Sequence, residues 1–140
     1  MRLLLTFLLI FSSLYAYEME EEYSVALQKA KVEHKPLLAY LYMLNCDTCE
    51  YMNKIVFTNP EVIAYLDKHY VVVHLYTNSK DLPVDFRVKV SPVFHFLNSS
   101  NGEMLESIIG GRKPKKFLRL LRSSYGAYLD EQKKIDNEAM

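Results

Sequence analysis

The chain has 140 residues, of which 50% are hydrophobic and 24% are charged, a composition that suits one globular domain with a sizeable core. Its 17 basic and 17 acidic side chains cancel to a formal net charge of zero. The chain therefore has no overall electrostatic attraction to nucleic acid or to an anionic membrane surface. No nucleic-acid partner is therefore predicted.

The amino-terminal segment has the pattern of an export signal. Residues 1–16, "MRLLLTFLLIFSSLYA", place Arg2 before an apolar run from Leu3 to Phe11 and end on Ala16. The run is well short of the ~20 residues that cross a bilayer as a helix. We therefore expect a signal peptide over residues 1–16, a periplasmic or secreted protein, and membrane contact only through this segment. An uncleaved anchor is the alternative.

The next segments alternate between helical and strand-like patterns. Apolar positions at helical spacing predict an amphipathic helix over residues 18–34, which Lys35-Pro36 ends. The unbroken apolar run "LLAYLYM", residues 37–43, predicts a strand buried on both faces. The segment "CEYMNKIVF" resumes helical spacing, so Cys46 is expected where this strand ends and a helix begins.

The middle of the chain predicts a second helix and a second strand. In "TNPEVIAYLDKHY", a cap residue and Pro60 at the first helical position mark a helix start. The β-branched run "YVVVHLY", residues 70–76, predicts another buried strand. A polar connection follows, with a short helix expected near residues 83–86.

The last third of the chain predicts a hairpin and a helix. The strand-like runs "PVFHFLN" and "EMLESIIG" flank "NSSNG", which indicates an antiparallel hairpin. After Gly110-Gly111, "KPKKFLRLLRSSYGAYL" places apolar residues on one stripe of a helix. Residues 131–140 are polar and are expected to fray as a carboxyl-terminal tail. This order predicts parallel strands joined by crossover helices before a terminal hairpin and helix.

The sequence holds two cysteines, Cys46 and Cys49, within "LNCDTCEYM". A bridge between them would close too short a loop to stabilise the fold much. A zinc site usually has four protein ligands, and the four histidines show no matching spacing, so no metal is predicted. Two sulfurs on one helical turn lie within bonding reach, which favours a redox pair. Two inert core cysteines are the alternative.

This element order, with a C-x-x-C pair opening the helix after the first buried strand and "VSP" leading into the hairpin, resembles the thioredoxin fold over residues 23–129. The stretch "KPLLAYLYMLNCDTCEYMNKIVFTNPEV" is similar to exported thioredoxin-like domains of bacterial thiol:disulfide interchange reductases. The resemblance implies an α/β thioredoxin-like domain over residues 17–130, with a central mixed four- to five-stranded sheet flanked by helices on both faces.

The resemblance also implies roles for four residues. Cys46 would be the attacking sulfur and Cys49 the resolving sulfur. Pro92 would be a cis-proline facing them, and its peptide bond would turn the backbone groups of Ser91 outward toward a client. Relatives commonly carry Trp before the first cysteine, whereas this chain has Asn45 and no Trp. Residues 42–44 are expected to supply the apolar contact instead.

Four further residues are expected to tune the sulfurs. Asp47, in the intervening pair with Thr48, puts a negative charge beside Cys46 and raises its pKa. Tyr40 stands where many relatives bury an acid that shuttles the proton of the resolving cysteine, but a phenol titrates near ~10 and is a poor base. His74 on the next strand is a possible proton acceptor, because imidazole titrates near neutral pH; an ordinary strand histidine is the alternative.

A less stabilised thiolate favours the disulfide form, which makes the reduced protein an electron donor. We therefore predict an exported thiol:disulfide oxidoreductase that reduces or isomerises disulfides. Its expected partners are cysteine-containing exported proteins and a membrane electron donor, and it needs no cofactor. Two alternatives stay open: a non-catalytic client-binding module of thioredoxin fold, and a dedicated reductant in cytochrome c maturation.

Overall fold

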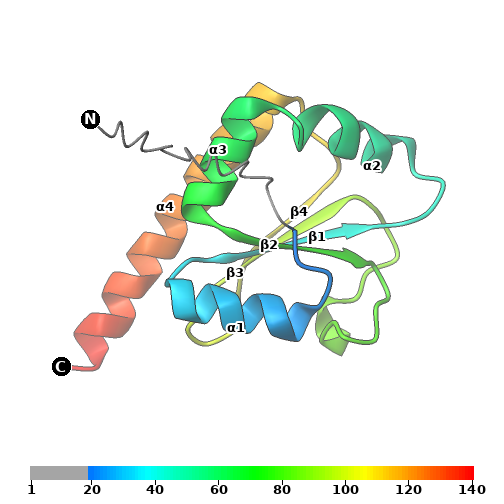
Figure 1. Ribbon diagram of the computed structural model, residues 1–140. Coiled ribbons are helices and arrows are strands. Elements are labelled where there is room, and N and C mark those ends of the chain that lie inside the picture. Colours follow the sequence, from blue (N-terminus) through cyan, green and yellow to red (C-terminus); the bar gives the residue numbers. More distant parts are fainter. Residues whose placement is uncertain (1–18) are drawn as a thin grey trace, which may run out of the picture.

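The computed structural model describes residues 19–140, and the expected signal peptide lies outside them. The helices and strands follow the predicted order (Figure 1): α1 (Tyr23–Glu33), β1 (Leu37–Tyr42), α2 (Asp47–Tyr51), a π-helical turn η1 (Met52–Val56), α3 (Pro60–His69), β2 (Val71–Tyr76), a 3-10 turn η2 (Val84–Phe86), β3 (Val93–Leu97), β4 (Met104–Ile109) and α4 (Pro114–Glu138).

The strands form one mixed four-stranded sheet in the order β2-β1-β3-β4. β1 runs parallel to β2 and antiparallel to β3, and β3 and β4 form the predicted hairpin. Glu20 adds a single parallel bridge at Val73, on the outer edge of β2. The predicted α/β thioredoxin-like fold, a central mixed sheet with helices on both faces, is confirmed.

Helices cover the two faces of the sheet unequally. Figure 1 shows α1 on one face and α2, α3 and α4 on the other. The α1 face buries the small residues Ala26 and Ala30 against β1 and β2. The opposite face is aromatic, with Tyr40, Phe94 and Phe117 among its fully buried side chains. β1 is thus buried on both faces, as its unbroken apolar run predicted.

The start of α3 has the predicted capping chemistry. The Asn59 side chain accepts hydrogen bonds from the amides of Glu61 and Val62, and Pro60 takes the first helical position. The helix after the cysteines departs from the prediction of a regular helix, because α2 changes to the π-helical turn η1 at Met52. Such turns widen the helix by one residue and often occur at functional sites.

The prediction that residues 131–140 fray is wrong, since α4 continues to Glu138. The Gln132 side-chain amide donates to Asn98 Oδ1 at 3.0 Å and to Ser100 Oγ at 3.3 Å, which ties this part of α4 to the β3–β4 turn. Ion pairs three residues apart within the helix join Lys133 to Asp130 and Lys134 to Glu131.

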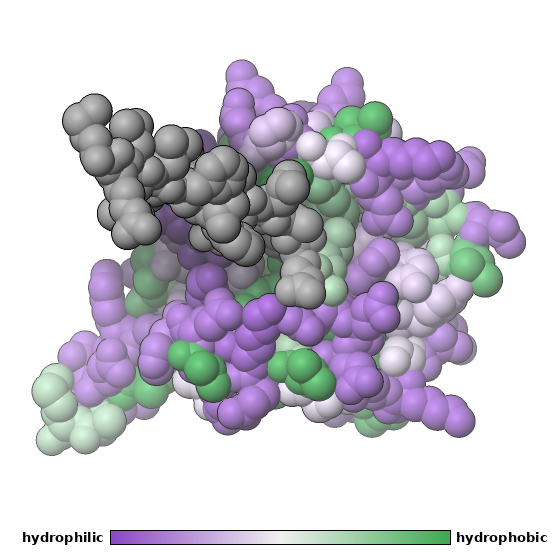
Figure 2. All heavy atoms as spheres, in the orientation of Figure 1, coloured by the Kyte–Doolittle hydropathy of each residue, from purple (hydrophilic) through white to green (hydrophobic). Residues whose placement is uncertain are grey.

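The molecular surface is mainly polar on the side where α1 lies. Figure 2 shows mostly hydrophilic spheres there, with separate apolar ones, in keeping with the exposed Val25 and Val32 of α1. Within residues 19–140, none of the helices combines the length and the apolar character that crossing a membrane requires.

Candidate active site

A disulfide joins Cys46 and Cys49 at the start of α2, with their Cα atoms 5.2 Å apart. Asn45 has a positive φ of 56°, a conformation that Asn tolerates better than most residues, and this turns the chain from β1 into the helix. Cys46 is the N-cap residue of α2, and its Sγ accepts a hydrogen bond from the Cys49 amide at 3.1 Å. The predicted position of Cys46, where a strand ends and a helix begins, is confirmed.

The two sulfur-bearing residues differ in access to solvent. Cys46 is half-buried, whereas Cys49 is 2% exposed. A molecule arriving from solvent therefore reaches Cys46 first. The amide hydrogen that points at Cys46 Sγ would also stabilise a thiolate there after reduction, since helix amino termini lower thiol pKa values.

A cis proline lies at the same end of the sheet as the disulfide. The Ser91–Pro92 peptide bond is cis, the isomer that the family resemblance implied. Leu41 pairs with Val93, so Pro92 stands next to the end of β1 where the cysteine loop begins. Pro92 is buried, whereas Ser91 is partly exposed.

The loop between β4 and α4 links the cis proline to the cysteine turn. The Gly110 amide donates to the Pro92 carbonyl at 2.8 Å. A Cβ atom added at Gly111 would lie 2.5 Å from the Thr48 Cγ2, so only glycine permits this approach. Thr48, between the two cysteines, therefore packs against the loop.

Arg112 fixes the shape of that loop. Its guanidinium Nη1 donates to the carbonyl oxygens of Ile109, Gly110 and Gly111 at 3.4, 3.1 and 3.0 Å. Its backbone amide approaches the Met52 sulfur at 3.4 Å, beneath the cysteine helix. Sequence reasoning missed Gly111 and Arg112 as site residues. The Gly110-Gly111 pair directly after a strand is the sequence signal that could have identified this loop.

Tyr40 lies directly beneath the cysteine helix and is fully buried. Its hydroxyl donates to the Cys49 backbone carbonyl at 3.3 Å. Its ring stacks on His74 and Phe94, with centroid distances of 4.7 and 5.2 Å. Burial, with a smaller contribution from the Tyr42 phenol, raises the pKa of Tyr40 further above its ordinary value. Tyr40 therefore stays protonated and serves as a hydrogen-bond donor, in agreement with its prediction as a poor base.

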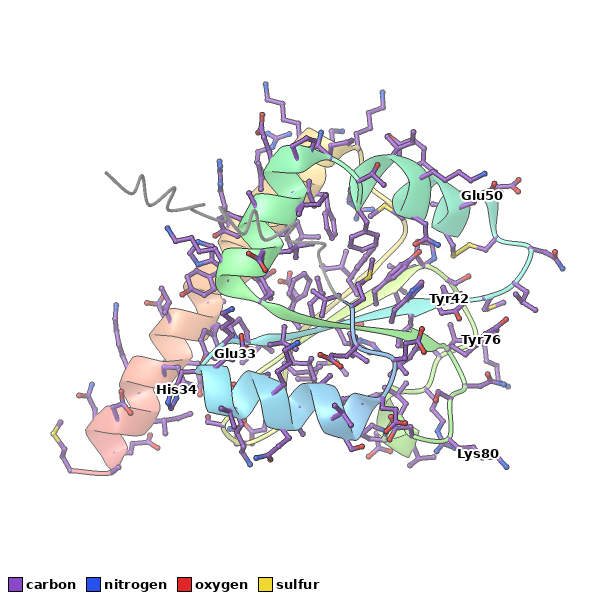
Figure 3. The ribbon with its side chains drawn as sticks, viewed as in Figure 1. Glu33, His34, Tyr42, Glu50, Tyr76 and Lys80 are labelled. Carbon is purple, nitrogen blue, oxygen red and sulfur yellow. A yellow bond between two sulfur atoms is a disulfide. The ribbon has the colours of Figure 1, made fainter. Side chains whose placement is uncertain are left out.

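His74 lies between the rings of Tyr40 and Tyr42, with Tyr42 only 4.1 Å away by ring centroids. Burial lowers the pKa of His74 to about 4. This favours the alternative of an ordinary strand histidine over the possible proton acceptor, because desolvation disfavours the charged imidazole. The aromatic row continues to Tyr76, which Figure 3 shows beside Tyr42 at the edge of the sheet.

A pocket of about 490 Å³ opens beside the disulfide. Its walls come from the loop after β1 and from one side of the cysteine helix, and they consist of Tyr42, Met43, Leu44, Asn45, Cys46, Asp47, Cys49, Glu50, Asn53 and Lys54. Leu44 is 70% exposed at its rim. His74 is not among the lining residues.

The acidic side chains of the pocket lie on the cysteine helix. Asp47 is exposed next to Cys46. Glu50, which projects outward in Figure 3, pairs with Lys54 one turn later. The hydrogen bond and charge of Lys54 lower the pKa of Glu50. Within residues 19–140, no cluster of three or more His, Cys, Asp or Glu side chains could hold a metal ion.

A mixed sheet of this order, with a C-x-x-C disulfide at a helix start and a cis proline at the same end of the sheet, defines a thioredoxin-like protein. A sequence model of the thioredoxin-like family matches residues 18–99, more than half of the chain. The chain therefore belongs to the thioredoxin-like family, as its sequence resemblance indicated. No curated protein sequence matches the chain.

Solved structures show the same fold. A thioredoxin from Thermus thermophilus has a TM-score of 0.67 and 26% identity, over 77% of this chain and 87% of that one. A candidate disulphide-isomerase from Bacteroides thetaiotaomicron has a TM-score of 0.65 and 27% identity, over 76% and 91%. The oxidised DsbD C-terminal domain of Neisseria meningitidis has a TM-score of 0.61 and 22% identity, over 76% and 99%. Together with the C-x-x-C disulfide, these findings support thiol–disulfide redox chemistry in general.

Proposed function

We propose that the protein is an exported thiol:disulfide oxidoreductase that reduces or isomerises disulfides of exported proteins. The observation that carries the proposal is the disulfide between a solvent-accessible Cys46 and a buried Cys49, with the Cys49 amide directed at Cys46 Sγ. This arrangement gives one sulfur the access and the hydrogen bond that a nucleophile needs. It keeps the other sulfur back for the second step.

In the reduced protein, the Cys46 thiolate attacks one sulfur of a client disulfide, and the other client sulfur leaves with the electron pair. Cys49 then attacks Cys46 Sγ, forms the internal disulfide and releases the second client sulfur. The client gains two electrons and two protons, and the protein becomes oxidised. A dithiol donor at the membrane restores the reduced protein by the same exchange in reverse.

Asp47 favours the reducing direction. Its exposed carboxylate follows Cys46 directly and lines the same pocket. A negative charge there opposes the helix dipole and raises the pKa of the Cys46 thiol. Because a less stabilised thiolate shifts the balance toward the disulfide, the reduced protein gives up its electrons more readily.

The client occupies the surface beside Cys46. Ser91, before the cis bond, is partly exposed, so its backbone groups are available to pair with an extended client segment. Met43 and Leu44 are 38% and 70% exposed on the other side of the disulfide and provide the apolar contact. The export pattern of residues 1–16 supports a client pool outside the cytosol, where disulfides persist.

The test is capture of clients in the compartment where the protein acts. Cys49→Ser leaves the mixed disulfide unresolved, so exported proteins should accumulate in covalent complexes with this variant and dissociate on treatment with a reductant. Cys46→Ser is the control and should capture none. Equal capture by both variants, or capture of cytosolic proteins alone, would contradict the proposal. Capture confined to apocytochromes c would instead assign the narrower role in cytochrome c maturation.

A further inference from the structure

The loop between β4 and α4 contacts both the cis proline and the cysteine turn, so its shape affects how a client lies beside Cys46. This question rests on the function proposed above, in which an extended client segment pairs with Ser91. The Gly110 amide holds the Pro92 carbonyl at 2.8 Å. A change in the shape of the loop at Gly110 would therefore move the surface on which the client lies.

Two adjacent glycines give this loop conformational freedom. Gly110 has a φ of 87°, in the left-handed region that glycine adopts readily, and Gly111 lies against Thr48 of the cysteine turn. Because glycine can reach many other conformations, these two residues do not hold the loop in one shape by themselves. A contact from outside the pair has to do so.

Arg112 supplies that contact. Its Nη1 donates to three successive carbonyl oxygens, those of Ile109, Gly110 and Gly111, at 3.4, 3.1 and 3.0 Å. Hydrogen bonds from a charged donor are stronger than those between neutral groups. Within residues 19–140, Arg112 forms no ion pair with an acidic side chain, so the loop carbonyl oxygens are the partners of its guanidinium.

The same peptide groups turn their amides away from the guanidinium, because N–H and C=O point in opposite directions across a trans peptide. The Gly110 amide reaches the Pro92 carbonyl on one side. The Arg112 amide reaches the Met52 sulfur, beneath the cysteine helix, at 3.4 Å. One side chain therefore orients the peptide groups that contact the cis proline and the cysteine helix.

We propose that Arg112 is a positioning residue for client binding, which holds the carbonyl oxygens of residues 109–111 and so keeps the Ser91–Pro92 edge aligned with Cys46. It acts through the loop and does not line the pocket beside the disulfide. A long client segment contacts both the edge and the sulfur and needs this alignment, whereas a small disulfide needs only access to Cys46. Loss of Arg112 therefore weakens the binding of an extended client more than it slows the chemical step.

The experiment compares reduction of a cystine-bridged peptide and of a small aromatic disulfide by the full chain, with a small dithiol as the electron donor. Arg112→Ala should raise the KM for the peptide about tenfold, within the roughly hundredfold that a misplacement of about 1 Å can cost. The kcat for the peptide, and the reduction of the small disulfide, should change by less than about twofold. Arg112→Lys keeps a cationic donor and should restore most of the parental KM.

Arg87→Ala is the matched control. The Arg87 side chain also donates to loop carbonyl oxygens, those of Leu82 and Lys80, at 3.1 Å each, and none of these residues lines the cysteine pocket. This variant should keep the parental KM for both substrates. A parental KM in Arg112→Ala, or an equal rise in Arg87→Ala, overturns the inference.

A second variant covers the case in which circular dichroism shows that Arg112→Ala does not fold. Arg112→Gln removes the charge and shortens the donor but retains a polar side chain. Parental kinetics in Arg112→Gln would then overturn the inference, and a raised KM for the peptide alone would support it. A parent that reduces neither substrate would instead refute the proposed function itself.

Discussion

The Tyr40 hydroxyl donates a hydrogen bond to the Cys49 backbone carbonyl at 3.3 Å, and both groups are buried. This bond connects the central strand to the helix that carries the deeper sulfur. Tyr40 also stands at the position where many relatives bury an acid. The position serves here to anchor the helix and does not supply a base.

Replacing Tyr40 by Phe should cost about 1 kcal/mol of stability, because the Cys49 carbonyl loses its side-chain donor in a buried setting. The pH dependence of Cys46 alkylation should not change, since the phenol stays protonated throughout the neutral range. Urea unfolding and alkylation rates provide the two measurements. Tyr70→Phe is a matched control, because its buried hydroxyl donates to the Leu121 carbonyl at 2.8 Å, away from the cysteines. A shifted alkylation profile in Tyr40→Phe alone would contradict the anchoring role.

His74 should make the fold less stable in acid. Its folded pKa of about 4 lies below the ordinary 6.5, so the unfolded chain binds a proton that the folded chain excludes between these values. The contribution of neutral His74 to the free energy of unfolding is fully present above about pH 6.5. It decreases as the pH falls toward about 4, by at most about 1.4 kcal/mol per pH unit for this group. His74→Phe keeps the aromatic packing and should reduce this slope in urea unfolding. Burial lowers the pKa of His95 and His69 as well, so part of the slope should remain. An unchanged slope would show that His74 is not the group involved.

Gly111→Ala should disturb the cysteine turn. The added Cβ would approach the Thr48 methyl group to 2.5 Å, so the loop or the turn has to move. We expect a loss of about 1–3 kcal/mol in unfolding free energy, as for other overpacked sites, together with slower reduction of client disulfides. Gly126→Ala is the control. This helical glycine has open space around its Cα, and alanine there should stabilise the protein by about 0.5–1 kcal/mol without affecting turnover. Equal effects of the two substitutions would contradict the close-approach argument.

Asp47→Asn should make Cys46 more reactive below neutral pH. Removing the carboxylate lowers the pKa of the Cys46 thiol, and an exposed charge pair is worth at most about 1 kcal/mol, so alkylation should accelerate by about two- to fivefold. The difference should shrink at high salt. Asp85→Asn, at an exposed acid in η2, should leave the rate unchanged. Slower alkylation of Asp47→Asn would show that this carboxylate does not destabilise the thiolate.

Local sequence signals predicted much of this protein. Asn59 and Pro60 identified the start of α3, and the unbroken apolar run of β1 identified its central place in the sheet, because capping and burial leave marks in neighbouring residues. The position of Cys46 at a helix start followed from the same two patterns. These features depend on a few adjacent side chains.

Other features depend on residues distant in sequence and could not be predicted in this way. The low pKa of His74 arises from its burial against rings on β1, and the helical residues near the carboxyl terminus include Gln132, which contacts Asn98 on a distant element. The role of Arg112 is likewise visible only in the folded structure, where its guanidinium donates to the carbonyl oxygens of the surrounding loop.

The hydrogen bond between Gln132 and Asn98 also fixes the last turns of α4 at the end of the sheet opposite the disulfide. Because Leu97 pairs with Leu37, the β3–β4 turn lies at the opposite end of the sheet from the disulfide, and the last turns of α4 extend from that end (Figure 1). Met140 is 98% exposed there. A fusion partner or solid support attached at this terminus would leave the sulfurs facing open solvent, which suits the protein to immobilisation with its C-x-x-C site accessible.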